Sequence, residues 1–212
     1  MQVNFNHQRR FGPEFRQARE LLRSRAIGDL VRLEGSCGNL FDWGNHWFDM
    51  FFFYNDERNV DWVLGQVERS GGKSIFGIKV EGQAISQFQF ENGVIGILST
   101  NVAEGWPLST RVVGTDGFIE AALRTDPLRI WDKGSDKWET VALEGENSLE
   151  ATVARGVMDA VESLKFGREP ELSSRKVIKA TELIFATYES ARRGGRIDLP
   201  VVADDSTVLA TA

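Results

Sequence analysis

An aspartate and a histidine four residues apart, Asp42 and His46, are the strongest candidates for chemistry in this sequence. They lie in the segment DWGNHWFD, which also contains Asp49. If the segment is helical, Asp42 and His46 share one face, and Asp49 neighbours His46. A histidine gains and loses its proton near neutral pH, and a nearby carboxylate can orient its ring or a substrate hydroxyl. The pair therefore suits oxidation of an alcohol, in which the hydroxyl proton must leave as hydride is transferred.

The same spacing also has a purely structural interpretation, which stays open at this stage. A D-x-x-x-H match is common by chance. Asp42 could cap a helix, and His46 could be a hydrogen-bonded core residue beside Trp47 and Phe48. Spacing alone favours this structural interpretation.

Four further residues are candidate substrate ligands: Arg9, Arg10, Asn45 and Trp106. The two arginines could bind an anion or a sugar, or form a solvated charge pair. Trp106 could stack on a sugar ring, although a tryptophan in a loop more often serves packing. His7 carries no signal by itself.

The composition excludes several classes of protein. The net charge of −6 and the pI of about 5.1 argue against a nucleic-acid partner, which requires a basic surface. Cys37 is the single cysteine, so neither an intramolecular disulfide nor a cysteine-based zinc site is expected, and we expect no metal ligands. The N-terminus lacks an apolar signal segment, and the densest apolar run, Trp47 to Tyr54, is too short to span a membrane. We therefore expect a cytoplasmic protein without a membrane partner.

Hydrophobic periodicity and turn residues predict helices at both ends of the chain and strands between them. Helices are expected at 13–27, in the second half of 39–55, and over the periodic sets at 149–164 and 177–191. Strands are expected at 2–8, 30–36, 60–67, 84–90, 94–100, 111–113, 118–123, 128–131 and 137–143.

The successive hairpins predict an α+β two-layer fold, with an open, mainly antiparallel β-sheet and helices packed on one face. Glu91-Asn92-Gly93 is the strongest of the turn signals. The strands around Trp62, Phe88 and Ile97 have apolar residues at both alternating sets of positions. We therefore expect the second face of the sheet to be partly apolar and to form a homodimer or higher homo-oligomer.

Five segments in order resemble the C-terminal domain of the glucose-fructose oxidoreductase, inositol dehydrogenase and rhizopine-catabolism (Gfo/Idh/MocA) family. They are NHQRRFGPEFRQARELLRSRAIGDLVRLEG, DWGNHWFD, FENGVIGILSTN, VVGTDGFIEA and KVIKATELIFATYESARRGGRIDLP. The resemblance covers nearly the whole chain. It implies a single substrate-binding and oligomerisation domain at 1–212, with a C-terminal strand and tail at 197–212.

The resemblance also implies a function. Family members join this domain to an N-terminal Rossmann domain and oxidise sugars or polyols with NAD or NADP. The family's catalytic aspartate and histidine correspond to Asp42 and His46. Its catalytic lysine, in an E-K-P motif of the Rossmann domain, has no counterpart here, and no G-x-G-x-x-G turn is present. The chain is thus expected to be the substrate-facing half of such an enzyme, inactive without the cofactor-binding half.

Two alternatives remain open from the sequence. One is a stand-alone, non-enzymatic sugar-binding or dimerisation module. The other is a cofactor-dependent glycosidase, because some family members break glycosidic bonds through a transient oxidation.

We expect that the chain alone does not bind NAD(P) tightly, because it lacks the glycine-rich turn and helix N-terminus that hold a pyrophosphate. Isothermal titration calorimetry with NAD and NADP measures this directly. Saturable binding with micromolar affinity would contradict the expectation.

Overall fold

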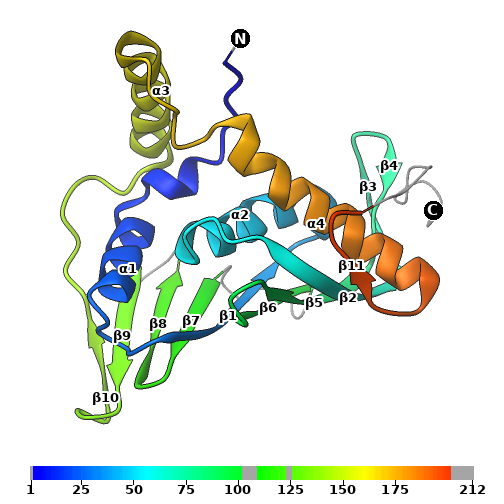
Figure 1. Cartoon of the computed structure of the whole chain (residues 1–212), viewed down its shortest axis with the longest axis horizontal. Coiled ribbons are helices and arrows are strands. Elements are labelled where there is room, and N and C mark those ends of the chain that lie inside the picture. Colours follow the sequence, from blue (N-terminus) through cyan, green and yellow to red (C-terminus); the bar gives the residue numbers. More distant parts are fainter. Residues whose placement is uncertain (1, 102–108, 123–125, 202–212) are drawn as a thin grey trace.

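A nine-stranded mixed sheet, mostly antiparallel, is the base of the computed structural model, which describes residues 2–101, 109–122 and 126–201 (Figure 1). Its strands lie in the order β10-β9-β8-β7-β1-β6-β5-β2-β11. In this sheet β1 and β6 run parallel, and the other described pairs are antiparallel. The strands are β1 (Leu30–Cys37), β2 (Val60–Glu68), β5 (Gln83–Phe90), β6 (Ile95–Thr100), β7 (Ser109–Gly114), β8 (Gly117–Ala122), β9 (Leu128–Asp132), β10 (Lys137–Thr140) and β11 (Ile197–Asp198), with a separate small hairpin of β3 (Ser74–Ile75) and β4 (Ile78–Lys79).

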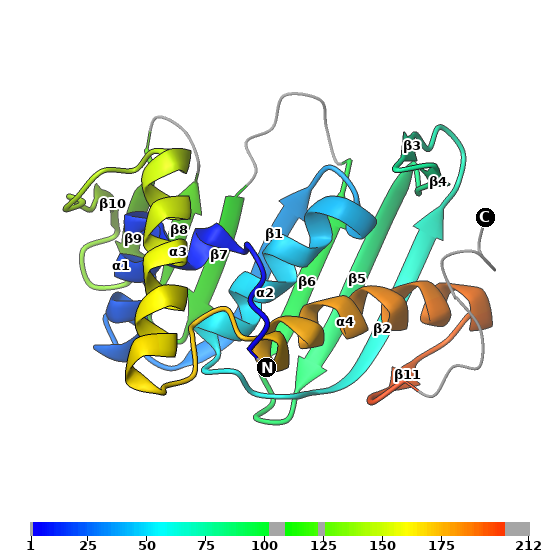
Figure 2. The ribbon, with the colours of Figure 1, turned by 90° about the horizontal axis from the view of Figure 1, so that it is seen from above.

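Helices cover one face of this sheet, which confirms the predicted α+β class. The helices are α1 (Pro13–Arg23), α2 (Asn45–Tyr54), α3 (Leu149–Phe166) and α4 (Ser174–Arg193), with a short 3₁₀ helix η1 (Gln8–Phe11) and a π-helical turn η2 (Leu40–Gly44). Viewed from the helical side, α4 crosses the strands at one end of the sheet and α2 lies near its middle (Figure 2). Helix α3 packs against η1 and stands off from the sheet (Figure 1).

Helix α2 forms in spite of its aromatic composition because it is enclosed on all sides. Every residue from Trp47 to Tyr54 is buried, and the helix contacts η1, α1, α4, β1 and β6. A helix that is apolar all round belongs in a core. Phe48 and Phe51 meet Phe88 of β5 at ring-centroid distances of 5.6 and 6.0 Å. The core thus fixes the end of α2 and, with it, the residues at its start.

The predicted N-terminal strand at 2–8 is wrong. Asn4 forms one isolated bridge with Ser173, and the chain then turns into η1. The turn brings His7 and Arg10 to Asp49, contacts that a straight strand would not make. Helix α1 ends at Arg23, earlier than predicted, and a series of turns leads to Gly28 at a φ of 75°.

The face of the sheet away from the helices is open, and part of it is apolar. Strand pairing places Trp62, Leu64, Ile85 and Ile97 on this face; Leu64 is 46% exposed and Ile85 45%. Phe88 points toward the helices and is fully buried against Phe48 and Phe51.

Charged residues occupy another part of the open face. Glu34, Arg111, Glu120 and Arg129 form a row of ion pairs across β1, β7, β8 and β9. The open face is therefore divided into an apolar and a charged region.

Gly65 sets the distance between β2 and α4. A Cβ atom at this position would lie 2.4 Å from the carbonyl oxygen of Thr187 and 2.7 Å from its Cγ2. We expect Gly65→Ala to lower the free energy of unfolding by about 2 kcal/mol, because the helix must move away from the strand. Urea unfolding measures this. Gly195→Ala is the matched control, since a Cβ atom at that position would meet no other atom within 4 Å; equal effects of the two substitutions would contradict the expectation.

Candidate active site

The turn η2 leads directly into α2 and places Asp42 and His46. The side-chain oxygen of Asn39 accepts a hydrogen bond of 2.7 Å from the backbone N–H of Asp42. The backbone N–H of Leu40 donates to the buried carboxylate of Glu81, which also accepts from the hydroxyl of Tyr188. Asn39, and not Asp42, is thus the capping residue. The carboxylate of Asp42 makes no hydrogen bond or ion pair with the described residues and is available to a ligand.

His46 lies in the first turn of α2 and is partly buried. Its ring centroid is 5.0 Å from that of His7 and 6.4 Å from that of Trp43, and its Nδ1 is buried without a hydrogen-bond partner. Burial, followed by the positive charges of Arg9 and His7, lowers the pKa of His46 to about 3. The imidazole is therefore neutral at pH 7 and can accept a proton, although a pKa this low makes it a weak base.

Asp49 contacts His7 and Arg10 from inside the core. One carboxylate oxygen lies 3.3 Å from Nδ1 of His7, and both oxygens accept from Arg10, at 2.7 and 2.8 Å. Burial alone would raise the pKa of Asp49, but the charge of Arg10 outweighs it and lowers the pKa to about 2. Asp49 is thus a buried anion that fixes the N-terminal turn. No pattern along the sequence connects His7 to this site.

Arg10 has a structural role. Its side chain is completely buried and, besides Asp49, contacts the carboxylates of Glu57 and Glu171. Burial would lower its pKa, but the surrounding carboxylates raise it. Because these contacts lie inside the protein, the geometry does not support the prediction that Arg10 binds substrate.

Arg9 differs from its neighbour in every contact. It is 8% exposed, and its guanidinium lies over the rings of Trp47 and Trp43, at 4.9 and 5.5 Å from their centroids. Its Nε and Nη1 are buried without a hydrogen-bond partner. Burial lowers the pKa of Arg9 to about 10, so the side chain stays charged at pH 7. Arg9 is therefore a cation without an ion pair among the described residues, and its charge acts on His46.

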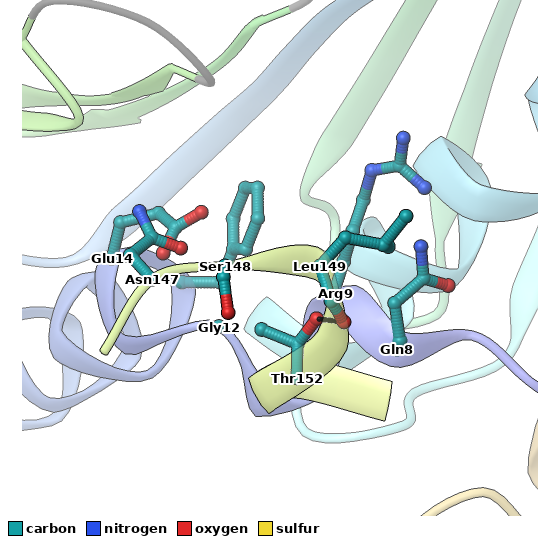
Figure 3. Close-up of a pocket in the computed structure, with 9 residues that line it drawn as sticks. Gln8, Arg9, Gly12, Glu14, Asn147, Ser148, Leu149 and Thr152 are labelled. Carbon is teal, nitrogen blue, oxygen red and sulfur yellow. Dashed lines mark hydrogen bonds between the residues drawn. The ribbon is translucent and has the colours of Figure 1, made fainter. Parts of the chain in front are cut away.

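A cavity of about 260 Å³ adjoins Arg9, between η1, the start of α1 and the start of α3 (Figure 3). Figure 3 shows Gln8 and Arg9 to one side of it, and Glu14 and Asn147 to the other. Oε1 of Gln8 and Oε2 of Glu14 are buried without partners, and burial raises the pKa of Glu14. The lining residues are Gln8, Arg9, Gly12, Glu14, Phe15, Asn147, Ser148, Leu149 and Thr152. Polar atoms able to bind a hydroxylated ligand thus collect here, a feature that no pattern along the sequence indicated.

The two other predicted substrate ligands, Asn45 and Trp106, are not among the described residues that line this cavity. The side-chain oxygen of Asn45 accepts a hydrogen bond of 3.2 Å from Thr181, which joins α2 to α4. Trp106 lies outside the described residues. The structure therefore brings together Arg9 and His46, with Asp42 one turn earlier, and ties Asn45 to the neighbouring helix.

Within the described ranges, no group of three or more histidine, cysteine, aspartate or glutamate residues is arranged to hold a metal ion. No helix in the same ranges is both long and apolar enough to cross a membrane.

The different bonding of the two arginines predicts different effects of their removal. Arg10→Gln should lower the free energy of unfolding by about 3 kcal/mol or more, because it leaves Asp49 as an uncompensated buried charge. Arg9→Gln should change it by less than about 1 kcal/mol, because no carboxylate loses an ion pair and Glu14 and Asp49 lose only a more distant charge. Urea unfolding at pH 7 measures both, and equal losses would contradict this assignment of roles.

Comparison with solved structures shows the same fold in several oxidoreductases. An oxidoreductase domain protein from Kribbella flavida is 16% identical, with a TM-score of 0.78 over 92% of this chain and 66% of that one. Levoglucosan dehydrogenase in complex with NADH and levoglucosan is 17% identical, with a TM-score of 0.77 over 94% of this chain and 67% of that one. An oxidoreductase from Agrobacterium radiobacter, in complex with NAD⁺, L-tartaric acid and magnesium, is 19% identical, with a TM-score of 0.73 over 93% of this chain and 65% of that one. The chain thus spans about two thirds of the length of these proteins.

No curated protein sequence matches the chain. The family model for the GFO/IDH/MocA C-terminal domain matches residues 32–120, which contain η2, α2 and the central strands. This match confirms the family resemblance seen in the sequence. Residues 32–120 are therefore similar to the GFO/IDH/MocA C-terminal domain, and the described chain shares the fold of the oxidoreductases above.

Proposed function

We propose that this chain binds a sugar or polyol and that His46 accepts the proton of its CH–OH group during an NAD(P)-dependent oxidation. The observation that carries the proposal is the state of His46: a neutral, partly buried imidazole next to the unpaired cation Arg9. The free carboxylate of Asp42 precedes it by one turn and can accept a hydrogen bond from the same or an adjacent hydroxyl.

Proton transfer is the part of the reaction that these residues can perform. As the C–H bond of the alcohol breaks, its hydroxyl becomes more acidic, and the imidazole takes up the proton. NAD(P) supplies the hydride acceptor in oxidations of this kind. The sequence has no glycine-rich nucleotide turn, so the residues present do not fit the dinucleotide by themselves and we derive no contact to it.

The ligands of structural neighbours support the substrate class. Levoglucosan dehydrogenase is described with NADH and levoglucosan, and also with L-sorbose. Both are carbohydrates, and the buried polar atoms of Gln8, Arg9 and Glu14 provide donors and acceptors for hydroxyl groups of this kind. The single cysteine, which can form no intramolecular disulfide, fits a reducing compartment, and a cytoplasmic location is part of the same proposal.

A homodimer through the open face of the sheet completes the proposal, because Leu64 and Ile85 leave apolar surface exposed there. We expect Leu64→Glu combined with Ile85→Lys to shift a dimer toward monomer. Light scattering at high micromolar concentration measures the mass. Ile178→Glu, at an exposed position of α4, is the control and should leave the mass unchanged. A wild-type chain that stays monomeric would contradict the proposed interface.

The proton-acceptor role is tested by His46→Ala, assayed with an NAD(P)-binding domain joined ahead of the chain. We expect turnover to fall by roughly 10²–10⁴-fold, the contribution typical of a general base. The free energy of unfolding should change by less than about 1 kcal/mol, because the ring is not a packing element of the core.

Asp42→Asn provides a second variant, which keeps the shape of the side chain but removes its charge. A core role for His46 predicts the opposite pattern, with a lower melting temperature and nearly unchanged turnover. If both variants turn over substrate at the wild-type rate, the assignment is wrong.

A further inference from the structure

Two adjacent arginines, Arg9 and Arg10, are both buried but differ in their ion pairs. Arg10 contacts three carboxylates, whereas Arg9 has no ion pair with the described residues and two of its nitrogens are buried without a partner. Both side chains are more than nine-tenths buried. Arg10 thus has three ion-pair partners, whereas the carboxylates of Glu14 and Asp49 act on Arg9 only at a distance, without an ion pair.

The partners that Arg9 does have leave the edge of its guanidinium free. The Cζ atom of Arg9 lies over the rings of Trp43 and Trp47, and this contact stabilises a cation without using its N–H groups. A buried guanidinium without hydrogen-bond acceptors is unfavourable, because each N–H has lost its water. The group that best matches paired, coplanar N–H donors is a carboxylate, which can accept two parallel hydrogen bonds.

We propose that Arg9 binds a carboxylate of the substrate, so that the ligand is a sugar acid or polyol acid and not a neutral sugar. This inference rests on the proposed function, because it places the carboxylate next to the proton acceptor of that reaction. Trp47 is fully buried, whereas Trp43 is 38% exposed, so a ligand can approach Arg9 from the side of the Trp43 ring. A ligand held on this side would extend toward His46, whose ring lies 6.4 Å from that of Trp43, and toward Asp42, which precedes Trp43 in the chain.

A carboxylate on Arg9 also changes His46. The charged groups that act on His46 are Arg9 and His7, which disfavour its protonation, and Asp49, which favours it. Neutralising the charge of Arg9 removes one of the unfavourable contributions and raises the pKa of His46 toward neutrality. Because a general base works best with a pKa near the working pH, a carboxylate on the substrate would strengthen the base as it binds.

Nuclear magnetic resonance titration of the two histidine rings tests this inference on the chain as it stands. The probes are D-glucuronate and D-glucose, which differ in the carboxylate that replaces the terminal CH₂OH, at constant ionic strength. His7→Gln assigns the two sets of ring signals. We expect D-glucuronate to shift the His46 signals saturably and to raise the pKa of His46 by about one unit, with D-glucose bound at least about 10-fold more weakly.

Substitutions identify the anchor. Arg9→Gln should weaken D-glucuronate binding about 10-fold or more and leave D-glucose binding unchanged. Arg25→Gln removes a surface arginine that is far more exposed than Arg9. This control variant should bind D-glucuronate and D-glucose as the wild type does, which excludes a general attraction of anions. If Arg9→Gln does not fold, Arg9→Lys replaces it. The lysine variant keeps the positive charge but lacks two parallel, coplanar N–H donors, so it should still weaken D-glucuronate binding.

The outcomes separate this inference from the proposed function. Equal binding of the two probes, with His46 shifted by both, overturns the carboxylate anchor and leaves the polyol site standing. D-glucuronate binding that survives substitution of Arg9 overturns the anchor as well. Failure of both probes to move the His46 signals overturns the inference and also contradicts a polyol site at His46.

Discussion

The buried ion pair between Arg10 and Asp49 is the interaction on which the site depends. It attaches the N-terminal turn η1 to the aromatic helix α2, and it draws Glu57 and Glu171 to the same point. Breaking such a pair leaves an uncompensated charge in the core, so the turn has one stable position. With Arg10 held inward, Arg9 is directed onto Trp43 and Trp47, beside His46. A structural ion pair thus fixes the position of Arg9 and of the proposed site.

Much of the fold follows from local patterns in the sequence. Alternating apolar residues and the Glu91-Asn92-Gly93 turn correctly predicted the β5–β6 hairpin, and the helical spacing of apolar residues predicted α3 and α4. The aromatic segment was predicted as a helix because it is too long for one strand. These features depend on neighbours along the chain, which the sequence displays directly.

The parts that could not be predicted depend on contacts between distant residues. Arg9 and Arg10 are the same residue type in adjacent positions, and they differ because Asp49, Glu57 and Glu171 form ion pairs with Arg10 and not with Arg9. The strand expected at 2–8 fails for the same reason, since the attraction of Arg10 to Asp49 outweighs the weak alternation of Val3 and Phe5. The D-x-x-x-H spacing located Asp42 and His46, but it could not show that a different aspartate would contact His7.

The parallel pairing of β1 with β6 has a consequence for how the chain can be divided. Strand β1 comes early in the sequence, yet it pairs with β6 on one side and β7 on the other, both of which come much later. Forming these pairs requires closure of a long loop, so we expect β1 to enter the sheet after the local hairpins have formed. Until then β6 and β7 each present an unpaired edge, which is prone to aggregation. Without β1, the two halves of the sheet would not be joined by described strand pairs. We therefore expect a proteolytic nick or circular permutation within 38–94 to be tolerated only if β1 can still pair with β6 and β7.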